Sequence, residues 1–102
     1  MVRLDRSARV SRGKFPEASQ WAKDATAYLR KNFGTNTECF VQRFGPVGVI
    51  VWQSDYPSLG ELDSTIAKMN ADKAWSATLA TSGEKGLFVE GSIVDRLLVT
   101  LG

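Results

Sequence analysis

Residues 37–54 read Thr-Glu-Cys-Phe-Val-Gln-Arg-Phe-Gly-Pro-Val-Gly-Val-Ile-Val-Trp-Gln-Ser, and this stretch decides the fold. Two runs rich in β-branched and aromatic residues flank Gly45-Pro46, which is the pattern of a β-hairpin. If Gly45-Pro46 forms the tip, Gln42 lies opposite Val49, and residues directly opposite each other share a face of the sheet. The second run is apolar almost without a break, which indicates a strand that is covered on both faces.

The two faces of this hairpin predict two different neighbours. One face is suited to dry packing under helices, and its members are Cys39, Val41, Ile50 and Trp52. The other face carries Gln42 among five large apolar residues, Phe40, Phe44, Val47, Val49 and Val51. An apolar patch of this kind is not a normal solvent face. We expect a second copy of the same sheet to cover it, which makes the protein a homodimer through the sheet face.

The flanking sequence supplies the other elements of the fold. Residues 2–12 alternate in polarity like a strand, and an apolar stripe at helical spacing runs from Phe15 to a capping Gly34. Ser58 and Asp72 are suitable N-caps for two further helical pieces, and residues 93–101 read as a last strand. The order β-α-β-β-α-(α)-β predicts a ferredoxin-like α+β fold. Its antiparallel four-stranded sheet carries helices on one face, with residues 1–102 forming one domain.

The composition excludes several classes of function. The chain of 102 residues has 13 basic and 11 acidic side chains, a balance that favours neither nucleic acid nor a membrane as a partner. No run approaches the roughly 18 apolar residues of a membrane span, and we expect a cytoplasmic protein. The chain has no histidine, which removes the usual general base at neutral pH and the commonest transition-metal ligand. We therefore expect neither a metal nor a cofactor.

Three polar residues are the candidates for ligand binding. Strand parity can place Arg9 and Gln42 on the second sheet face, and Arg96 lies on one face of the last strand. A guanidinium group in a partly closed apolar lumen favours a carboxylate or another anion. The alternative is that these residues pair with acidic side chains across the dimer and only fix its register. Trp75 follows a helix break, where pockets often open. The alternative is that it is a packing residue, as a tryptophan on the apolar face of a helix more often is. The candidate ligand-binding set is Arg9, Phe40, Gln42, Phe44, Val49, Trp75 and Arg96, and no catalytic residue is assigned.

Several segments resemble the dimeric α+β-barrel superfamily, which includes antibiotic-biosynthesis-type monooxygenases, NIPSNAP-type proteins and stress-responsive barrel proteins. The matching pieces are Val10 to Lys14, followed by a helix with Glu17, Ala18 and Trp21, then Val49 to Ser54 and Asn70 to Trp75. The overlap covers almost the whole chain, but each motif is degenerate. The resemblance implies a homodimer whose two sheets form a shared barrel. It also implies a small-molecule pocket in each protomer, between sheet and helices or at the barrel mouth. Haem-degrading members use a histidine on the second helix, and this chain has none.

Two hypotheses for function follow. In the first, the chain is a small dimeric barrel protein that binds a small apolar or anionic molecule in a pocket of the sheet. In the second, it is a cofactor-independent monooxygenase or isomerase that acts on an aromatic or polyketide-like substrate. The enzyme hypothesis needs a closed, mostly apolar cavity with at least two convergent polar groups, and the sequence alone does not decide between the two.

Overall fold

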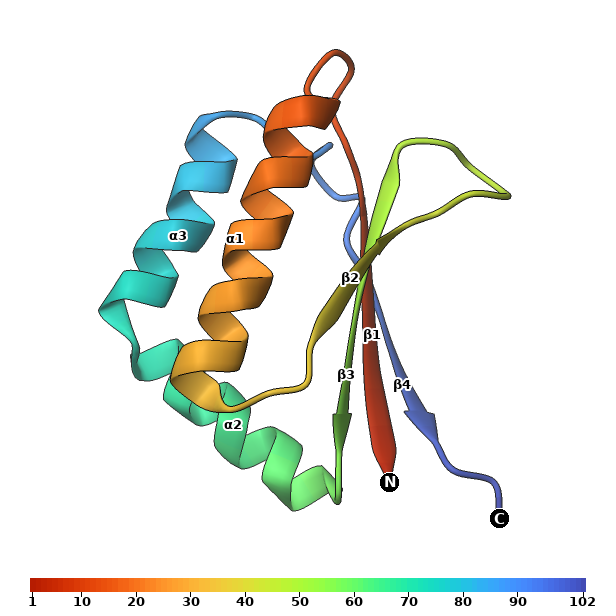
Figure 1. The fold of residues 1–102 in the computed structure, drawn as a ribbon, viewed down its shortest axis with the longest axis vertical. Helices are drawn as coiled ribbons and strands as arrows, with labels where there is room; N and C mark the ends of the chain where they lie inside the picture. Colours follow the sequence, from red (N-terminus) through yellow and green to blue (C-terminus); the bar gives the residue numbers. More distant parts are fainter.

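The structure is a computed structural model that describes residues 1–102, and it consists of one sheet with helices on one of its faces (Figure 1). The four strands are β1 (Val2–Arg9), β2 (Glu38–Val41), β3 (Val49–Tyr56) and β4 (Val94–Val99). The three helices are α1 (Phe15–Phe33), α2 (Leu59–Ala71) and α3 (Lys73–Glu84).

The sheet confirms the predicted ferredoxin-like arrangement. Its strand order is β2-β3-β1-β4, and every neighbouring pair is antiparallel. The short β2 and the C-terminal β4 are therefore the two edges. The predicted register of the hairpin is also confirmed, since Cys39 pairs with Trp52 and Phe40 with Val51.

The tip of the hairpin differs from the two-residue turn that the sequence suggested. Regular pairing stops at Val41 and Val49, and residues 42–48, hereafter the tip loop, form an open bend. Pro46 has no backbone N–H to donate to a ladder, and Gly45 and Gly48 have φ of 93° and 72°, outside the range of a strand. The tip loop extends beyond the sheet on the side away from the helices (Figure 1).

Three local signals account for the helix boundaries. Gly34 ends α1 in the left-handed conformation, with φ 64° and ψ 22°. The hydroxyl of Ser58 accepts from the backbone N–H of Glu61 at 3.2 Å and begins α2. A carboxylate oxygen of Asp72 accepts from the backbone N–H of Trp75 at 2.8 Å and begins α3. The Ser58 and Asp72 side chains each supply an acceptor for a backbone N–H that has no partner within its helix.

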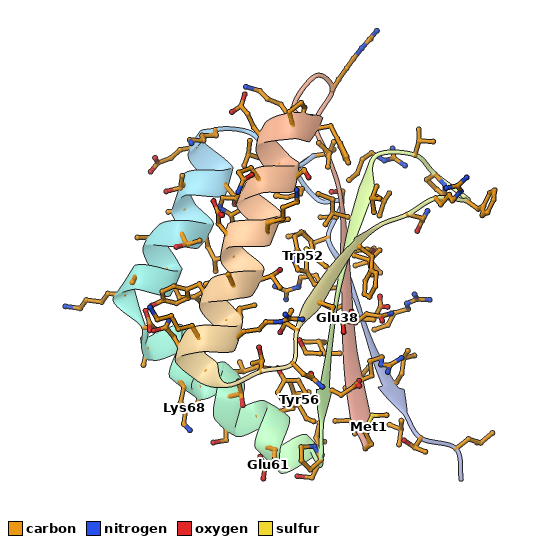
Figure 2. The ribbon with its side chains drawn as sticks, viewed as in Figure 1. Met1, Glu38, Trp52, Tyr56, Glu61 and Lys68 are labelled. Carbon is orange, nitrogen blue, oxygen red and sulfur yellow. The ribbon has the colours of Figure 1, made fainter.

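The core lies between the sheet and the helices. Its main cluster consists of Val10, Ala18, Ala22, Ile50 and Leu87, with Trp21, Trp52 and Phe88 packed against it. The three aromatic rings meet edge to face with centroids 5.6–6.3 Å apart. In Figure 2, Trp52 points from β3 toward α1, as its predicted place on the dry face requires. Small alanines on α1 allow the helix to lie close to the strands.

Two details of the prediction were wrong. The first strand ends at Arg9 and not at residue 12, because the chain turns away after an isolated bridge between Val10 and Phe88. The bridge and the hydrogen bonds on either side of it place residues 87–89 against the end of β1. Val41 has the predicted parity, but it is exposed, because it lies at the end of the edge strand β2.

Candidate functional site

The sheet face opposite the helices, hereafter the open face, has no covering layer within the chain. Cross-strand pairing places four rows of side chains on it. In order β2, β3, β1, β4, two rows read Glu38, Gln53, Asp5, Arg96 and Phe40, Val51, Ser7, Val94. The row towards the hairpin tip holds Gln42, Val49 and Arg9, and the opposite row holds Asp55, Arg3 and Leu98. The Phe40 row is thus mainly apolar, and the two rows beyond it, away from the hairpin tip, are mainly polar or charged.

A pocket of about 500 Å³ lies on the open face at the end nearest the tip loop. Its volume falls within the usual range for small-molecule sites. It is lined by Ser7, Ala8, Arg9, Gln42, Pro46, Val49, Val89, Glu90, Gly91, Ser92 and Val94. Residues from β1, β3, β4, the tip loop and the turn before β4 therefore converge on one space.

Arg9 is the main electrostatic feature of this pocket. Its guanidinium group forms no ion pair, and its backbone is held in place by two hydrogen bonds. The backbone N–H of Arg9 donates to Ser92 Oγ at 3.0 Å, and its carbonyl accepts from the N–H of Val89 at 2.8 Å. The backbone of Arg9 is thus held in place, while its guanidinium group remains available to donate hydrogen bonds to an anion.

Gln42 and Ser7 add neutral polar groups. The amide nitrogen of Gln42 donates to the carbonyl of Pro46 at 3.0 Å, which leaves the amide oxygen without a partner in the chain. The hydroxyl of Ser7 makes no side-chain hydrogen bond. Glu90 faces the same space from the turn before β4, and its carboxylate is not in an ion pair. The pocket therefore offers a cation, an anion and two neutral polar groups on an apolar floor.

The structure separates Arg96 from this pocket. Its Nη2 lies 3.4 Å from Asp5 Oδ1, and the other oxygen of Asp5 accepts from Gln53 at 2.9 Å. Asp5 is only 3% exposed although it lies on the open face. Arg96 thus pairs with an acidic side chain within its own chain and not across a dimer, whereas Arg9 has no such partner in the chain.

A second charged row lies at the end of the open face away from the tip loop. Arg3 binds the carboxylate of Asp55 through two nitrogens, at 2.6 and 3.1 Å. The hydrogen bond from Arg3 lowers the pKa of Asp55 below its ordinary value. A smaller pocket of about 220 Å³ lies beside this pair and includes Phe40 and Glu38 in its lining.

The seven candidate residues are therefore distributed over several places. Arg9, Gln42 and Val49 share the pocket. Phe40 lies one row away on the open face, and Phe44 is in the tip loop, beyond the sheet. Trp75 lies on the opposite side of the sheet, buried between α1 and α3, where it stacks on Tyr28 at 6.0 Å. In this structure Trp75 is therefore a packing residue and does not line the pocket on the open face.

Sequence reasoning did not identify Ser7, Glu90, Ser92 or Val94 as pocket residues. Ser92 lies in the turn before β4, and the position of that turn beside β1 follows only from long-range pairing. No group of three or more metal-ligating side chains occurs in the chain. None of the helices has the length and apolar character required to cross a membrane.

Comparison with known proteins supports the architecture. No known protein family has a sequence profile that matches this chain, and no curated protein matches it. Several solved structures do. A NIPSNAP domain protein from Burkholderia xenovorans aligns with 100% of this chain and 96% of its own, with a TM-score of 0.83 and 19% identity.

Two oxygenase-type structures share the same fold at lower identity. An antibiotic biosynthesis monooxygenase aligns over 100% of both chains with a TM-score of 0.73 and 12% identity. SnoaB, a cofactor-independent oxygenase from Streptomyces nogalater, aligns with 99% of this chain and 93% of its own, with a TM-score of 0.69 and 10% identity. At such identities the likeness concerns the fold alone. The chain shares its ferredoxin-like α+β fold with the NIPSNAP and antibiotic biosynthesis monooxygenase structures.

Proposed function

We propose that this protein is a homodimer that binds a small molecule with a single anionic group and an apolar body in the Arg9 pocket. The observation that carries the proposal is the unpaired guanidinium group of Arg9 above an apolar floor that includes Val49 and Val94. Three other arginines of the two strands, Arg3, Arg6 and Arg96, already have carboxylate partners. Arg9 is therefore the sheet cation that is available for an outside anion.

The dimer is proposed because the open face is not suited to water. Phe40, Val94 and Leu98 are exposed on it, and further exposed apolar residues lie in the tip loop. A second sheet placed over the open face would bury these side chains and would also turn the Arg9 pocket into an enclosed site. Inside such a site a charge-assisted hydrogen bond is stronger than it is in water.

Glu90 narrows the class of anion. Glu90 lines the same pocket as Arg9, so that a dianion there would meet one cation and one like charge. A monoanion such as a carboxylate could accept two hydrogen bonds from the guanidinium group of Arg9. Glu90 would repel it less than it would repel a dianion. The apolar floor would then favour an aromatic or aliphatic body over a small hydrated ion.

The proposal is tested by calorimetric titration with 2-naphthoate as the carboxylate probe and inorganic phosphate as the dianion. We expect naphthoate to bind and phosphate not to bind. Arg9→Met keeps the apolar stem and removes the charge, and we expect it to weaken naphthoate binding by about 10- to 100-fold, the usual range for a lost charged hydrogen bond. Arg12→Met is the matched control, because Arg12 lies outside the pocket. Equal binding to the two variants would refute the site.

The second candidate function is a cofactor-independent monooxygenase or isomerase acting on an aromatic or polyketide-like substrate. It is supported by the pocket's convergent polar groups, Arg9, Gln42 and Ser7, and by the fold shared with an oxygenase that needs no cofactor. Oxygen consumption in the presence of anthrone would test the oxygenase form. A rate no faster than the buffer control would count against the oxygenase form.

A further inference from the structure

The tip loop carries two large apolar side chains that nothing in the chain covers. Phe44 is 84% exposed and Val47 is 82% exposed. The loop lies past the open face, on the side away from the helices (Figure 1). Its bend is defined by the bond from Gln42 to the Pro46 carbonyl and by glycines at positive φ. A second copy that faces the open face would therefore meet this loop.

The directions of the strands indicate where the loop would land. Each neighbouring pair is antiparallel, so that β2 runs with β1 and against β4. Both β2 and β4 are sheet edges with unpaired backbone groups. An antiparallel approach of β2 from one copy to β4 of the other continues the alternation of the sheet and is the more stable kind of pairing. This approach places the tip loop beside the start of β4, at Ile93 and Val94.

The receiving end of β4 matches the loop in two respects. Ile93 and Val94 are exposed apolar residues, as Phe44 and Val47 are. The charges are also complementary, because Arg43 in the tip loop and Glu90 in the turn before β4 are both without an ion pair. Val94 and Glu90 line the Arg9 pocket.

We propose that the tip loop of each subunit closes the Arg9 pocket of the other, with the partner's Phe44 against Val94 and the partner's Arg43 near Glu90. The inference rests on the proposed function, because it needs both the dimer and the pocket. It adds that neither site is complete in one chain. A ligand in the pocket would then contact residues of both subunits.

Disulfide trapping tests this contact, because a disulfide forms only when two Cα atoms lie about 4.4–6.8 Å apart. The background is Cys39→Ala, which removes the only native thiol. The test variant combines Phe44→Cys with Val94→Cys. The matched control combines Phe44→Cys with Leu98→Cys. Leu98 lies on the same face of β4 as Val94, four residues further along the strand. Val94 and Leu98 are similarly exposed, at 54% and 44%.

After mild oxidation we expect the Val94 variant to migrate mainly at twice the chain mass on a denaturing gel, while the Leu98 variant and Phe44→Cys alone remain single chains. Preferential linking through Leu98, or linking of Phe44→Cys to itself, would overturn the inference. Sedimentation of the unoxidised protein separates the two proposals. A dimer that gives no cross-link through Val94 overturns only the shared pocket, whereas a monomer overturns the dimer as well.

Discussion

At the scale of single residues, the Arg6–Asp95 pair shows what a pattern of polarity can and cannot predict. Arg6 breaks the apolar parity of the first strand, which indicates either a position near a sheet edge or a side chain that extends its charged end to water. The structure places it on the helix side of β1, where its guanidinium group donates to both oxygens of Asp95 at 2.7 and 2.8 Å. The partner was not predictable, because it depends on the register between β1 and β4, strands separated by most of the chain.

This pair predicts a pH-dependent contribution to stability. The hydrogen bond from Arg6 lowers the pKa of Asp95 in the folded state. The ion pair therefore contributes stability above the pKa that Asp95 has in the unfolded chain, about 4. This contribution is lost as the pH falls through the pKa of Asp95 in the folded protein. At pH 7, Asp95→Asn should reduce the free energy of unfolding by about 0.5–1 kcal/mol, since both side chains are nearly half exposed.

Urea denaturation at equal protein concentration, at pH 7 and again below pH 4, measures the effect. The difference between the wild type and Asp95→Asn should shrink at the lower pH. Asp63→Asn is the control, because Asp63 is exposed on α2 and forms no ion pair. If the Asp95 variant differed from the wild type equally at both pH values, its effect would not come from the ion pair.

At the scale of elements, the helix boundaries were predictable, whereas the tip loop was not. The caps at Gly34, Ser58 and Asp72 depend on neighbours within four residues, so that the sequence contains the whole signal. The tip loop depends on how seven residues with two glycines and a proline bend in three dimensions. The register was still correct, because the two strands keep their facing pattern on either side of the loop.

Asp72 joins two elements and gives the prediction at this scale. Its carboxylate caps α3 at Trp75 and also accepts from the hydroxyl of Tyr28 on α1, at 3.0 and 3.1 Å. Asp72→Ala should lower the free energy of unfolding by about 1–2 kcal/mol, the usual loss for an N-cap. Asp72→Asn keeps an acceptor oxygen and should recover most of it. Circular dichroism during urea denaturation measures both variants, and an Asn variant as unstable as the Ala variant would contradict the capping role.

At the scale of the whole molecule, the sequence predicted that the hairpin has two different faces, and the structure shows both. The helix side is filled by the core cluster, in agreement with the predicted dry face. The open face has the parity that the sequence predicted, but its pocket could not be foreseen, since it forms where β1, β3, β4 and two connecting segments meet. The residues that complete the pocket come from turns whose places are set by pairing over long sequence separations.

The proposed dimer gives the prediction at this scale. Phe40 lies on the open face and is 45% exposed, whereas Leu79 lies on α3 with 43% exposure. Because both side chains already reach water in one chain, lysine at either position should leave the protomer folded. Phe40→Lys would place a charge on each subunit inside the proposed dimer interface, and we expect the dimer affinity to fall by about 100-fold or more. Leu79→Lys, on the outer helix layer, should leave the dimer affinity unchanged.

Sedimentation over a range of protein concentrations measures both variants. If Phe40→Lys associates as tightly as the wild type, the open face is not the dimer interface, and another layer must cover its apolar rows.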